Sequence, residues 1–212
     1  MKVLLINGSP KEKGCTWTAL SEVEKVLKEE DIETEIFHIG NKAVQGCAAC
    51  GKCADLGKCV FDDIVNVLLE KSKKADSFIF GSPVYYASAN GSLIALMDRL
   101  FYAGAFYADG KTFALKPAAA VVCARRAGTT AALDQINKYF AINAMPQIPS
   151  QYWNMLHGAK PEDAAKDLEG LQIMRTLARN TAWLLKSIEA GKKSGVALPK
   201  REETRYRTNF IR

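Results

Sequence analysis

The sequence has no long apolar run. Its 212 residues contain no stretch near the ~20 consecutive apolar residues that a membrane-spanning helix needs. The opening run VLLI is also too short for the core of a secretory signal peptide. We therefore expect a cytoplasmic protein. Hydrophobic residues at 48% and charged residues at 25% are ordinary for a single globular domain with a full core.

Histidine is scarce, and two familiar nucleotide-binding motifs are missing. His38 and His157 have no carboxylate or serine in a recognisable catalytic arrangement, and we identify no protein nucleophile. The loop after the first apolar run has only Gly8 and Gly14, which excludes the GxGxxG dinucleotide fingerprint, and no GK[ST] follows, which excludes a P-loop. Chemistry carried by a cofactor would need no protein nucleophile.

Most of the chain has little net charge. From Lys192 onward, seven basic residues against two acidic ones account for +5 of the formal net charge of +6. Nucleic-acid binding needs a patterned basic surface rather than a basic tail. We expect residues 191–212 to be a solvated or subunit-clasping tail, with neither nucleic acid nor a membrane as a partner.

Short apolar runs alternate with longer amphipathic segments, which predicts βαβ units and a parallel sheet. The predicted strands are KVLLIN (2–7), ETEIFHI (33–39, a plausible edge), DSFIFGSP (76–83), PAAAVVCA (117–124) and MPQIPSQYWNM (145–155). The predicted helices cover 18–30, 62–74, 92–101, 129–141 and 161–190. These elements indicate an α/β doubly wound five-stranded parallel sheet in a three-layer sandwich. Residues 1–190 would form this domain, with a cysteine loop inserted at 40–60.

In a doubly wound sheet, ligands bind beyond the carboxyl ends of the strands, so the loops after strands one, three and four should meet there. The first, NGSPKEKGCTWTAL, offers Ser9, Lys11 and Thr16 with the free N–H groups of a helix start. That set suits a phosphate, although an ordinary βα turn explains it equally well. The third, GSPVYYASANGSL, places two aromatic side chains where they suit a flat ring. The fourth brings Arg125 to the same rim. An arginine beside a flavin stabilises the anionic reduced ring, although an ordinary surface arginine is the commoner explanation.

NGSPKEKGCTWTAL, GSPVYYASANGSLIALMDRL and the order of elements resemble the flavodoxin-like NAD(P)H-dependent FMN reductase superfamily, over residues 1 to about 190. With CAACGKCADLGKC added, the chain is most similar to the iron–sulfur flavoproteins within it. The resemblance implies a flavodoxin-like fold and an FMN site. Its residues would be Ser9, Lys11, Cys15 and Thr16 at the phosphate, and Pro83, Val84, Tyr85, Tyr86 and Arg125 around the isoalloxazine ring. Trp17 would also belong to the FMN site. Two positions depart from the pattern, because Ile94 stands where relatives often carry Lys, and Cys15 where they carry Asn or Ser.

Four cysteines lie within thirteen positions, with the spacing C-x2-C-x2-C-x5-C. A zinc ribbon would present two separated C-x2-C pairs, whereas this compact run favours one face of a cubane cluster. Zinc and free redox-active thiols stay open from the residues alone, and a disulfide staple is disfavoured in a reducing cytoplasm. The resemblance implies a [4Fe–4S] cluster on Cys47, Cys50, Cys53 and Cys59. Cys123, in an apolar strand, is expected to be a core residue.

We therefore expect an FMN-dependent oxidoreductase that passes electrons between NAD(P)H or a ferredoxin-type donor and an acceptor. The alternatives are a cluster-free NAD(P)H-dependent FMN, quinone or nitro reductase and, in another class, a zinc-binding or thiol redox-sensing module. The cysteine loop should follow strand two, on the far side of strand one from strand three. A homodimer or homotetramer would then bring a neighbour's cluster to the flavin. Asp98–Arg99 is interpreted as a helix-surface pair or subunit contact.

Overall fold

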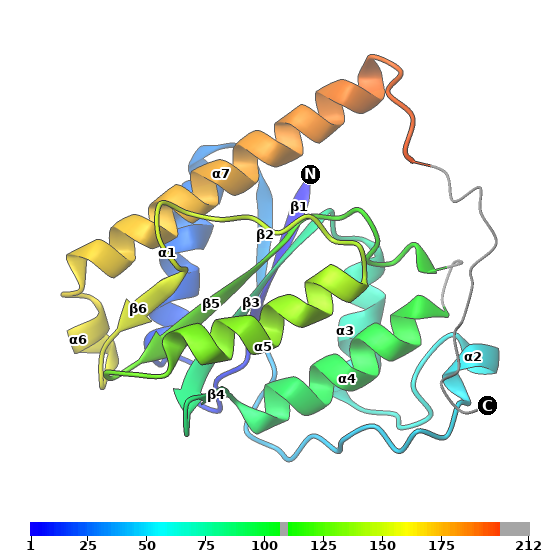
Figure 1. The fold of residues 1–212 in the computed structure, drawn as a ribbon, viewed down its shortest axis with the longest axis horizontal. Helices are drawn as coiled ribbons and strands as arrows, with labels where there is room; N and C mark the ends of the chain where they lie inside the picture. The colour runs from blue at the N-terminus through cyan, green and yellow to red at the C-terminus, as the bar shows by residue number, and fades with distance from the viewer. Residues whose placement is uncertain (107–109, 200–212) are drawn as a thin grey trace, which may run out of the picture.

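Strands and helices alternate along the chain (Figure 1). The computed structural model describes residues 1–106 and 110–199, so most of the predicted tail, 200–212, lies outside the described residues. The strands are β1 (Lys2–Asn7), β2 (Glu33–His38), β3 (Ser77–Tyr85), β4 (Ser88–Ala89), β5 (Ala118–Ala124) and β6 (Met155–His157). The helices are α1 (Cys15–Glu29), α2 (Cys53–Leu56), α3 (Ile64–Lys73), α4 (Gly91–Ala105), α5 (Thr129–Ile142), α6 (Pro161–Ala164) and α7 (Leu168–Lys193).

The sheet has the predicted doubly wound topology. Its parallel strands lie in the order β2-β1-β3-β5-β6, and the short β4 pairs antiparallel with β3. Taken alone, the parallel strands follow the flavodoxin-like order 2-1-3-4-5. The prediction of five parallel strands with strand two at an edge is confirmed, and β4 is a sixth strand that the sequence did not predict.

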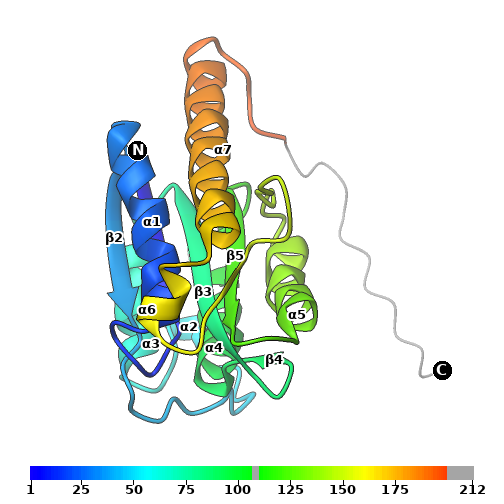
Figure 2. The same ribbon diagram turned by 90° about the vertical axis from the view of Figure 1, so that its left-hand side faces the viewer.

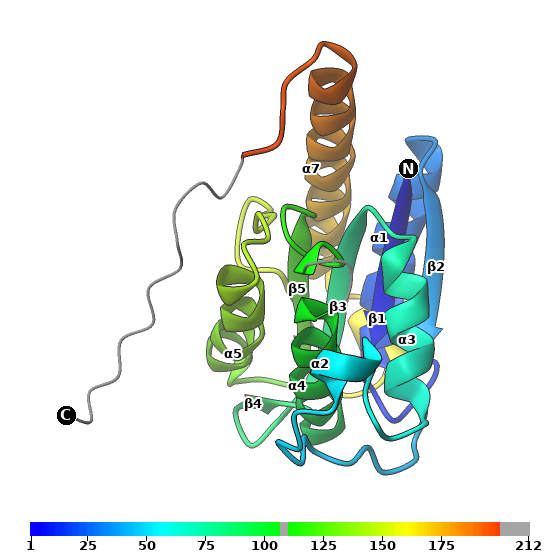
Figure 3. The ribbon, with the colours of Figure 1, turned by 90° about the vertical axis from the view of Figure 1, so that its right-hand side faces the viewer.

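Helices cover both faces of the sheet, so the fold has three layers. Alternate residues of each central strand enter opposite cores, as the pleat requires: Leu4 and Ile6 of β1 pack toward α3, α4 and α5, while Val3 and Leu5 pack toward α1 and α7. Figures 2 and 3 show these two layers from opposite sides. Within the described ranges, no helix is both long enough and apolar enough to cross a membrane.

The strand predicted over 145–155 is mostly wrong. Only Met155–His157 forms a regular strand beside β5. The preceding segment contacts β5 through an isolated bridge between Gln147 and Ala118 and through Val122 N, which donates to Asn154 O at 3.0 Å. Pro146 and Pro149 have no N–H to donate, which interrupts the ladder. Residues 149–153 then form a loop away from the sheet. The two ends of this loop are joined by a hydrogen bond from Asn154 Nδ2 to Ile148 O at 3.3 Å.

The long helix predicted over 161–190 is two helices, because Asp167 interrupts it. Asp167 is the N-cap of α7, where its Oδ1 accepts from Gly170 N at 2.9 Å. Its Oδ2 accepts from the backbone N of His157 at 2.7 Å. The Asp167 carboxylate therefore separates α6 from α7. It caps the start of α7 and also bonds to the end of β6. Helix α7 also runs three residues beyond the predicted domain end, to Lys193.

Gly81, in the middle of β3, tests how tightly α1 packs on the sheet. A Cβ there would lie 2.8 Å from Thr16 Cγ2 and 2.9 Å from Leu20 Cδ1. We expect Gly81→Ala to lower the free energy of unfolding by about 1–3 kcal/mol, through overpacking. Chemical denaturation measures this. Gly91→Ala is the control, because a Cβ at exposed Gly91 meets nothing within 4 Å; equal stability losses in both variants would contradict the packing argument.

Candidate functional site

The start of α1 is open to an anion. Gly14 is the N-cap and makes no side-chain capping bond, and the first turn of α1 contains no acidic residue. Buried Thr16, 1% exposed, has no hydrogen bond from its hydroxyl, which lies beside the thiol of Cys123. Ser9 Oγ accepts from the backbone N of Lys11 at 3.1 Å, which shapes the loop ahead of the helix. The unpaired N–H groups and hydroxyl together favour a negatively charged ligand.

The loop after β1 is held against β3 by a close backbone approach. Gly8 N donates to Gly81 O over 2.8 Å. A Cβ on Gly8 would lie 2.7 Å from that oxygen and 2.7 Å from Leu93 Cδ2, so no larger residue fits without a shift. Glycine at this position therefore fixes where the first loop meets the third strand.

The third loop is a two-residue hairpin that joins β3 to β4. Tyr86 and Ala87, its central residues, both have positive φ, 50° and 57°. Two positive φ values define a type I′ turn, which usually takes Asn-Gly, so this backbone is strained. Gln135 of α5 holds the hairpin, since its Oε1 accepts from Ala89 N at 2.9 Å. The turn presents Tyr86 entirely to solvent.

The fourth loop packs against the tip of this hairpin. Gly128 has φ +92°, and a Cβ on it would lie 2.6 Å from Ala87 Cα and 3.0 Å from Val84 Cγ1. A side chain at Gly128 would therefore separate the two loops. Arg125, just before this contact, is exposed at the same rim. The expectation that the loops after strands one, three and four meet at one edge is thus confirmed.

The predicted FMN residues all lie at this edge, but they differ in exposure. The buried or half-buried ones are Ser9, Cys15, Thr16, Trp17, Pro83 and Val84, and the exposed ones are Lys11, Tyr85, Tyr86 and Arg125. Cys15 Sγ contacts Gly158 O at 3.5 Å, and burial raises the pKa of its thiol. Because the Cys15 thiol stays neutral, the backbone N–H groups at the start of α1 are the polar groups that this turn offers to a ligand. His38 also reaches the loop, with Nε2 2.8 Å from Ser9 O.

The four clustered cysteines line one pocket. Cys47 and Cys50 are exposed on irregular chain, Cys53 is buried at the start of α2, and Cys59 is half-buried. Gly51 and Gly57 turn the chain through positive φ, 69° and 63°, on either side of α2. Burial raises the pKa of the Cys53 thiol, and the other three cysteines raise it further. The loop therefore gathers all four sulfur-bearing side chains around one hollow.

The path of the cysteine loop differs from the one predicted. The loop leaves the edge strand β2 but does not stay on that side of the sheet. It crosses below the carboxyl ends of the strands and reaches α4, the helix that follows β3 and β4 (Figure 1). Arg99, Tyr102 and Ala103 of α4 complete the wall of the cysteine pocket. The predicted placement on the far side of β1 from β3 is therefore wrong.

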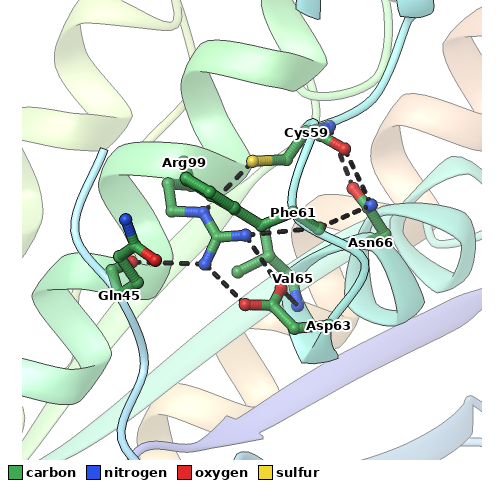
Figure 4. A network of polar contacts seen from close by, with 7 residues as sticks. All are labelled: Gln45, Cys59, Phe61, Asp63, Val65, Asn66 and Arg99. Atoms are coloured by element: carbon green, nitrogen blue, oxygen red, sulfur yellow. Dashed lines mark hydrogen bonds and ion pairs between the residues drawn. The ribbon is translucent and has the colours of Figure 1, made fainter. Parts of the chain in front are cut away.

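Arg99 of α4 holds the chain between β2 and α3 through a network of polar contacts (Figure 4). Its side chain is 1% exposed, and its guanidinium donates to both carboxylate oxygens of Asp63 over 2.7 and 2.9 Å. Burial alone would lower the pKa of Arg99, but its bonds to Asp63 and Cys59 outweigh this and raise it. The interpretation of Asp98–Arg99 as a surface pair is thus wrong for Arg99. Asp98 does lie at the surface, where it accepts from Tyr139.

The donor set suits iron or zinc in kind, because four thiols share one pocket without a competing ligand type. The distances between the four side chains do not match those of a bound metal ion. In the part of the chain that the structure describes, no three His, Cys, Asp or Glu side chains are close enough to hold a metal ion. The cysteines fit a thiolate-ligated centre in the kind of donor and in lining one pocket, whereas the distances between them in this structure are too long for three of them to ligate one ion.

Three residues that shape these sites were not predicted as site residues: Arg99, Asn66 and Gln135. Arg99 was detectable in part, since the segment LIALMDRLFYAGA is apolar around most of the helix and leaves an arginine little access to water. Asn66 and Gln135 gave no signal, because polar residues on amphipathic helices are ordinarily solvated. Their partners, the Cys59 backbone and the β4 hairpin, come close only in the folded chain.

Two relatives and one solved structure are similar to this chain over most of its length. An iron–sulfur flavoprotein of Methanocaldococcus jannaschii is 34% identical over 196 residues, covering 89% of this chain and 100% of the relative. An iron–sulfur flavoprotein of Methanosarcina thermophila is 30% identical over 193 residues, covering 89% and 97%. The crystal structure of RosB with bound 8-demethyl-8-formylriboflavin-5'-phosphate has a TM-score of 0.70 at 14% identity, covering 100% of this chain and 92% of that chain.

That structural likeness supports the fold alone. The family is given by sequence: residues 1–160 match the family described as NADPH-dependent FMN reductase. This match spans the three loops of the carboxyl edge and the cysteine pocket. The chain belongs to the NADPH-dependent FMN reductase family.

Proposed function

We propose that the protein is an FMN-dependent oxidoreductase that transfers electrons through FMN and, in its complete form, through a [4Fe–4S] cluster. The observation that carries the flavin site is the meeting of three loops at the carboxyl edge, next to a helix start without a cap. Family membership agrees with this assignment. Bound FMN would supply the hydride and electron chemistry, so no protein nucleophile is required.

The first loop would hold the phosphate of FMN. The backbone N–H groups at the start of α1 and the unpartnered Thr16 hydroxyl provide donors, and Lys11 provides a cation at the surface. Ser9 is already engaged as the acceptor for Lys11 N, and its hydroxyl hydrogen remains available to a phosphate oxygen. Trp17, the next residue of α1 after Thr16, is half-buried. These residues bind and orient the cofactor.

The third and fourth loops would hold the isoalloxazine ring. Pro83 and Val84 fix the backbone at the end of β3, and the strained turn exposes the aromatic faces of Tyr85 and Tyr86. Backbone groups and aromatic side chains of this kind suit the edge and face of a flat ring. Arg125, free at the surface of the fourth loop, would stabilise negative charge on the reduced ring.

Cys47, Cys50, Cys53 and Cys59 would ligate the [4Fe–4S] cluster. Their compact spacing, their shared pocket and the iron–sulfur flavoprotein names of two relatives support this assignment. When bound, the cluster would supply one-electron transfer. All six cysteines are free of disulfides, which agrees with a reducing, cytoplasmic environment.

NAD(P)H or a ferredoxin-type protein would be the electron donor. A homodimer or homotetramer would place the cysteine pocket of one copy near the flavin loops of another, since both sites face solvent through exposed residues, Cys47 and Cys50 on one side and Tyr86 on the other. A monomeric mass in solution for fully loaded protein would contradict this assembly.

A cluster-free reductase is the second candidate, and one observation favours it. The thiols share a pocket, yet no three of them are gathered to ligating distance within the described chain. The cysteines would then be free thiols in a hydride-accepting FMN, quinone or nitro reductase. A zinc-binding or redox-sensing module is the candidate of another class, and it would contain no flavin.

A visible absorption spectrum separates these candidates. We expect protein purified without oxygen to show flavin bands with a broad brown shoulder that bleaches on dithionite addition, accompanied by iron and labile sulfide. Flavin bands without iron would identify the cluster-free reductase. Colourless protein that contains zinc and fails to bind added FMN would refute the oxidoreductase assignment.

Lys11→Gln tests the phosphate site. We expect this change to weaken FMN binding by about tenfold, or about 1.4 kcal/mol, because it removes a cation next to the start of α1. Quenching of flavin fluorescence on titration into flavin-free protein gives the affinity. Lys13→Gln is the matched control, since Lys13 lies in the same loop with its Nζ 5.9 Å from the centre of the Trp17 ring. Equal losses in both variants would indicate non-specific charge attraction.

Cys50→Ser tests the metal site. We expect anaerobic Cys50→Ser protein to lose most of its iron and sulfide while it retains FMN, because a hydroxyl is a poor ligand for cluster iron. Cys15→Ser serves as the control, because Cys15 is half-buried outside the cysteine pocket. Iron contents that remain equal in wild type and Cys50→Ser would remove Cys50 from the ligand set.

A further inference from the structure

Cys59 is held differently from the other three cysteines of the pocket. Its backbone is clamped by the side chain of Asn66, a residue of α3 that is 8% exposed. Asn66 Oδ1 accepts from Cys59 N at 2.9 Å, and Asn66 Nδ2 donates to Cys59 O at 2.9 Å and to Phe61 O at 3.0 Å. One buried amide therefore fixes the backbone of Cys59 on both sides (Figure 4).

The sulfur of Cys59 also has a partner. Arg99 Nε donates to Cys59 Sγ over 3.2 Å. Among the described residues (1–106 and 110–199), no side chain of another residue hydrogen-bonds to the sulfur of Cys47, Cys50 or Cys53. The four candidate ligands are thus unequal, and one is fixed before any metal binds.

The Arg99 guanidinium cannot turn away from this sulfur without breaking other bonds. Its remaining N–H groups donate to the two oxygens of Asp63, to Gln45 O at 3.2 Å and to Phe61 O at 3.4 Å. These bonds and the one to Cys59 match the five donors of a guanidinium. The Phe61 ring covers it, with its centre 5.0 Å from Arg99 Cζ. The cation is fully engaged and fixed in direction.

Asp63 fixes Arg99 from the other side. Asp63 is the N-cap of α3, and its Oδ1 accepts from Val65 N at 3.1 Å as well as from Arg99. The carboxylate therefore belongs to a rigid helix start and not to a mobile loop. Arg99, on α4, and Asp63, at the start of α3, hold Cys59 from two separate elements.

We propose that Arg99 is a positioning residue that presets Cys59 as a cluster ligand and, through its N–H···S hydrogen bond and its charge, favours the reduced cluster. This inference rests on the proposed [4Fe–4S] centre. A bound cluster would take up one electron on reduction, from reduced FMN or from an added reductant, and no bond to Arg99 would form or break. The added negative charge spreads over the sulfurs, where hydrogen bonds and positive charge raise the reduction potential.

Variants at Arg99 separate the hydrogen bond from the charge. Arg99→Lys keeps the cation but has no Nε–H at Cys59, and Arg99→Gln removes both. We expect Arg99→Lys to lower the equilibrium constant for cluster reduction about tenfold, which is about 59 mV for a one-electron couple. Arg99→Gln should lower it further. The readout is the midpoint potential from a redox titration of the anaerobically purified holoprotein, followed by electron paramagnetic resonance.

Asn66→Ala is the matched control. It removes three hydrogen bonds that position the Cys59 backbone but leaves the charge and the sulfur contact of Arg99 in place. A purely structural role for the network predicts equal shifts in all three variants. The proposed role predicts a change of less than about threefold for Asn66→Ala. Equal shifts, or an unchanged potential in both Arg99 variants, would overturn the proposal.

A measurement on the wild-type protein covers the case in which Arg99 variants do not fold. With isotope-labelled arginine nitrogens, pulsed electron paramagnetic resonance of the reduced cluster should detect a weak coupling to one arginine nitrogen. A loaded cluster without that coupling would refute the contact. Wild-type protein that contains FMN but no iron would instead refute the cluster on which the inference rests, so the two failures are distinguishable.

Discussion

The buried ion pair between Arg99 and Asp63 is the constraint on which the arrangement of the two sites depends. A guanidinium with 1% of its side chain exposed must find an anion and hydrogen-bond acceptors inside the protein. The start of α3 supplies the carboxylate, and the chain between β2 and α3 supplies the carbonyls of Gln45 and Phe61. The long segment after β2 is therefore drawn across the molecule to α4, together with its cysteines.

Helix α4 consequently serves both candidate sites. It begins at Gly91, two residues after the hairpin proposed to hold the flavin ring, and its Arg99 lies in the wall of the cysteine pocket. At 1.5 Å per residue, these two positions are about 12 Å apart along the helix axis. In the proposed assembly, a rigid helix of this kind would fix the separation between flavin and cluster in one chain, and a neighbouring copy would provide a shorter path.

Local sequence patterns predicted the elements whose cause is local. Apolar runs such as KVLLIN bury on both faces of a parallel sheet, and β1, β3 and β5 form where expected. The cysteine spacing likewise predicted that the four cysteines serve one centre, and their side chains do line one pocket. Patterns failed where a distant partner decides the outcome. Pro146 and Pro149 broke the last strand, Asp167 divided the last helix, and the Tyr86–Ala87 turn closed without a glycine because Gln135 and Gly128 hold it from other elements.

The sequence by itself determined three things. Hydrophobic periodicity gave the α/β fold class, chain connectivity placed the loops after three strands at one edge of the sheet, and the residue types in those loops set the ligand chemistry available there. Only the tertiary structure decided which side of the sheet the cysteine loop takes and which cysteine is fixed in advance. The physical reason is the buried guanidinium of Arg99. Its need for an anion and for five acceptors is met by residues 36 to 54 positions away in the chain, a distance over which sequence patterns carry no signal.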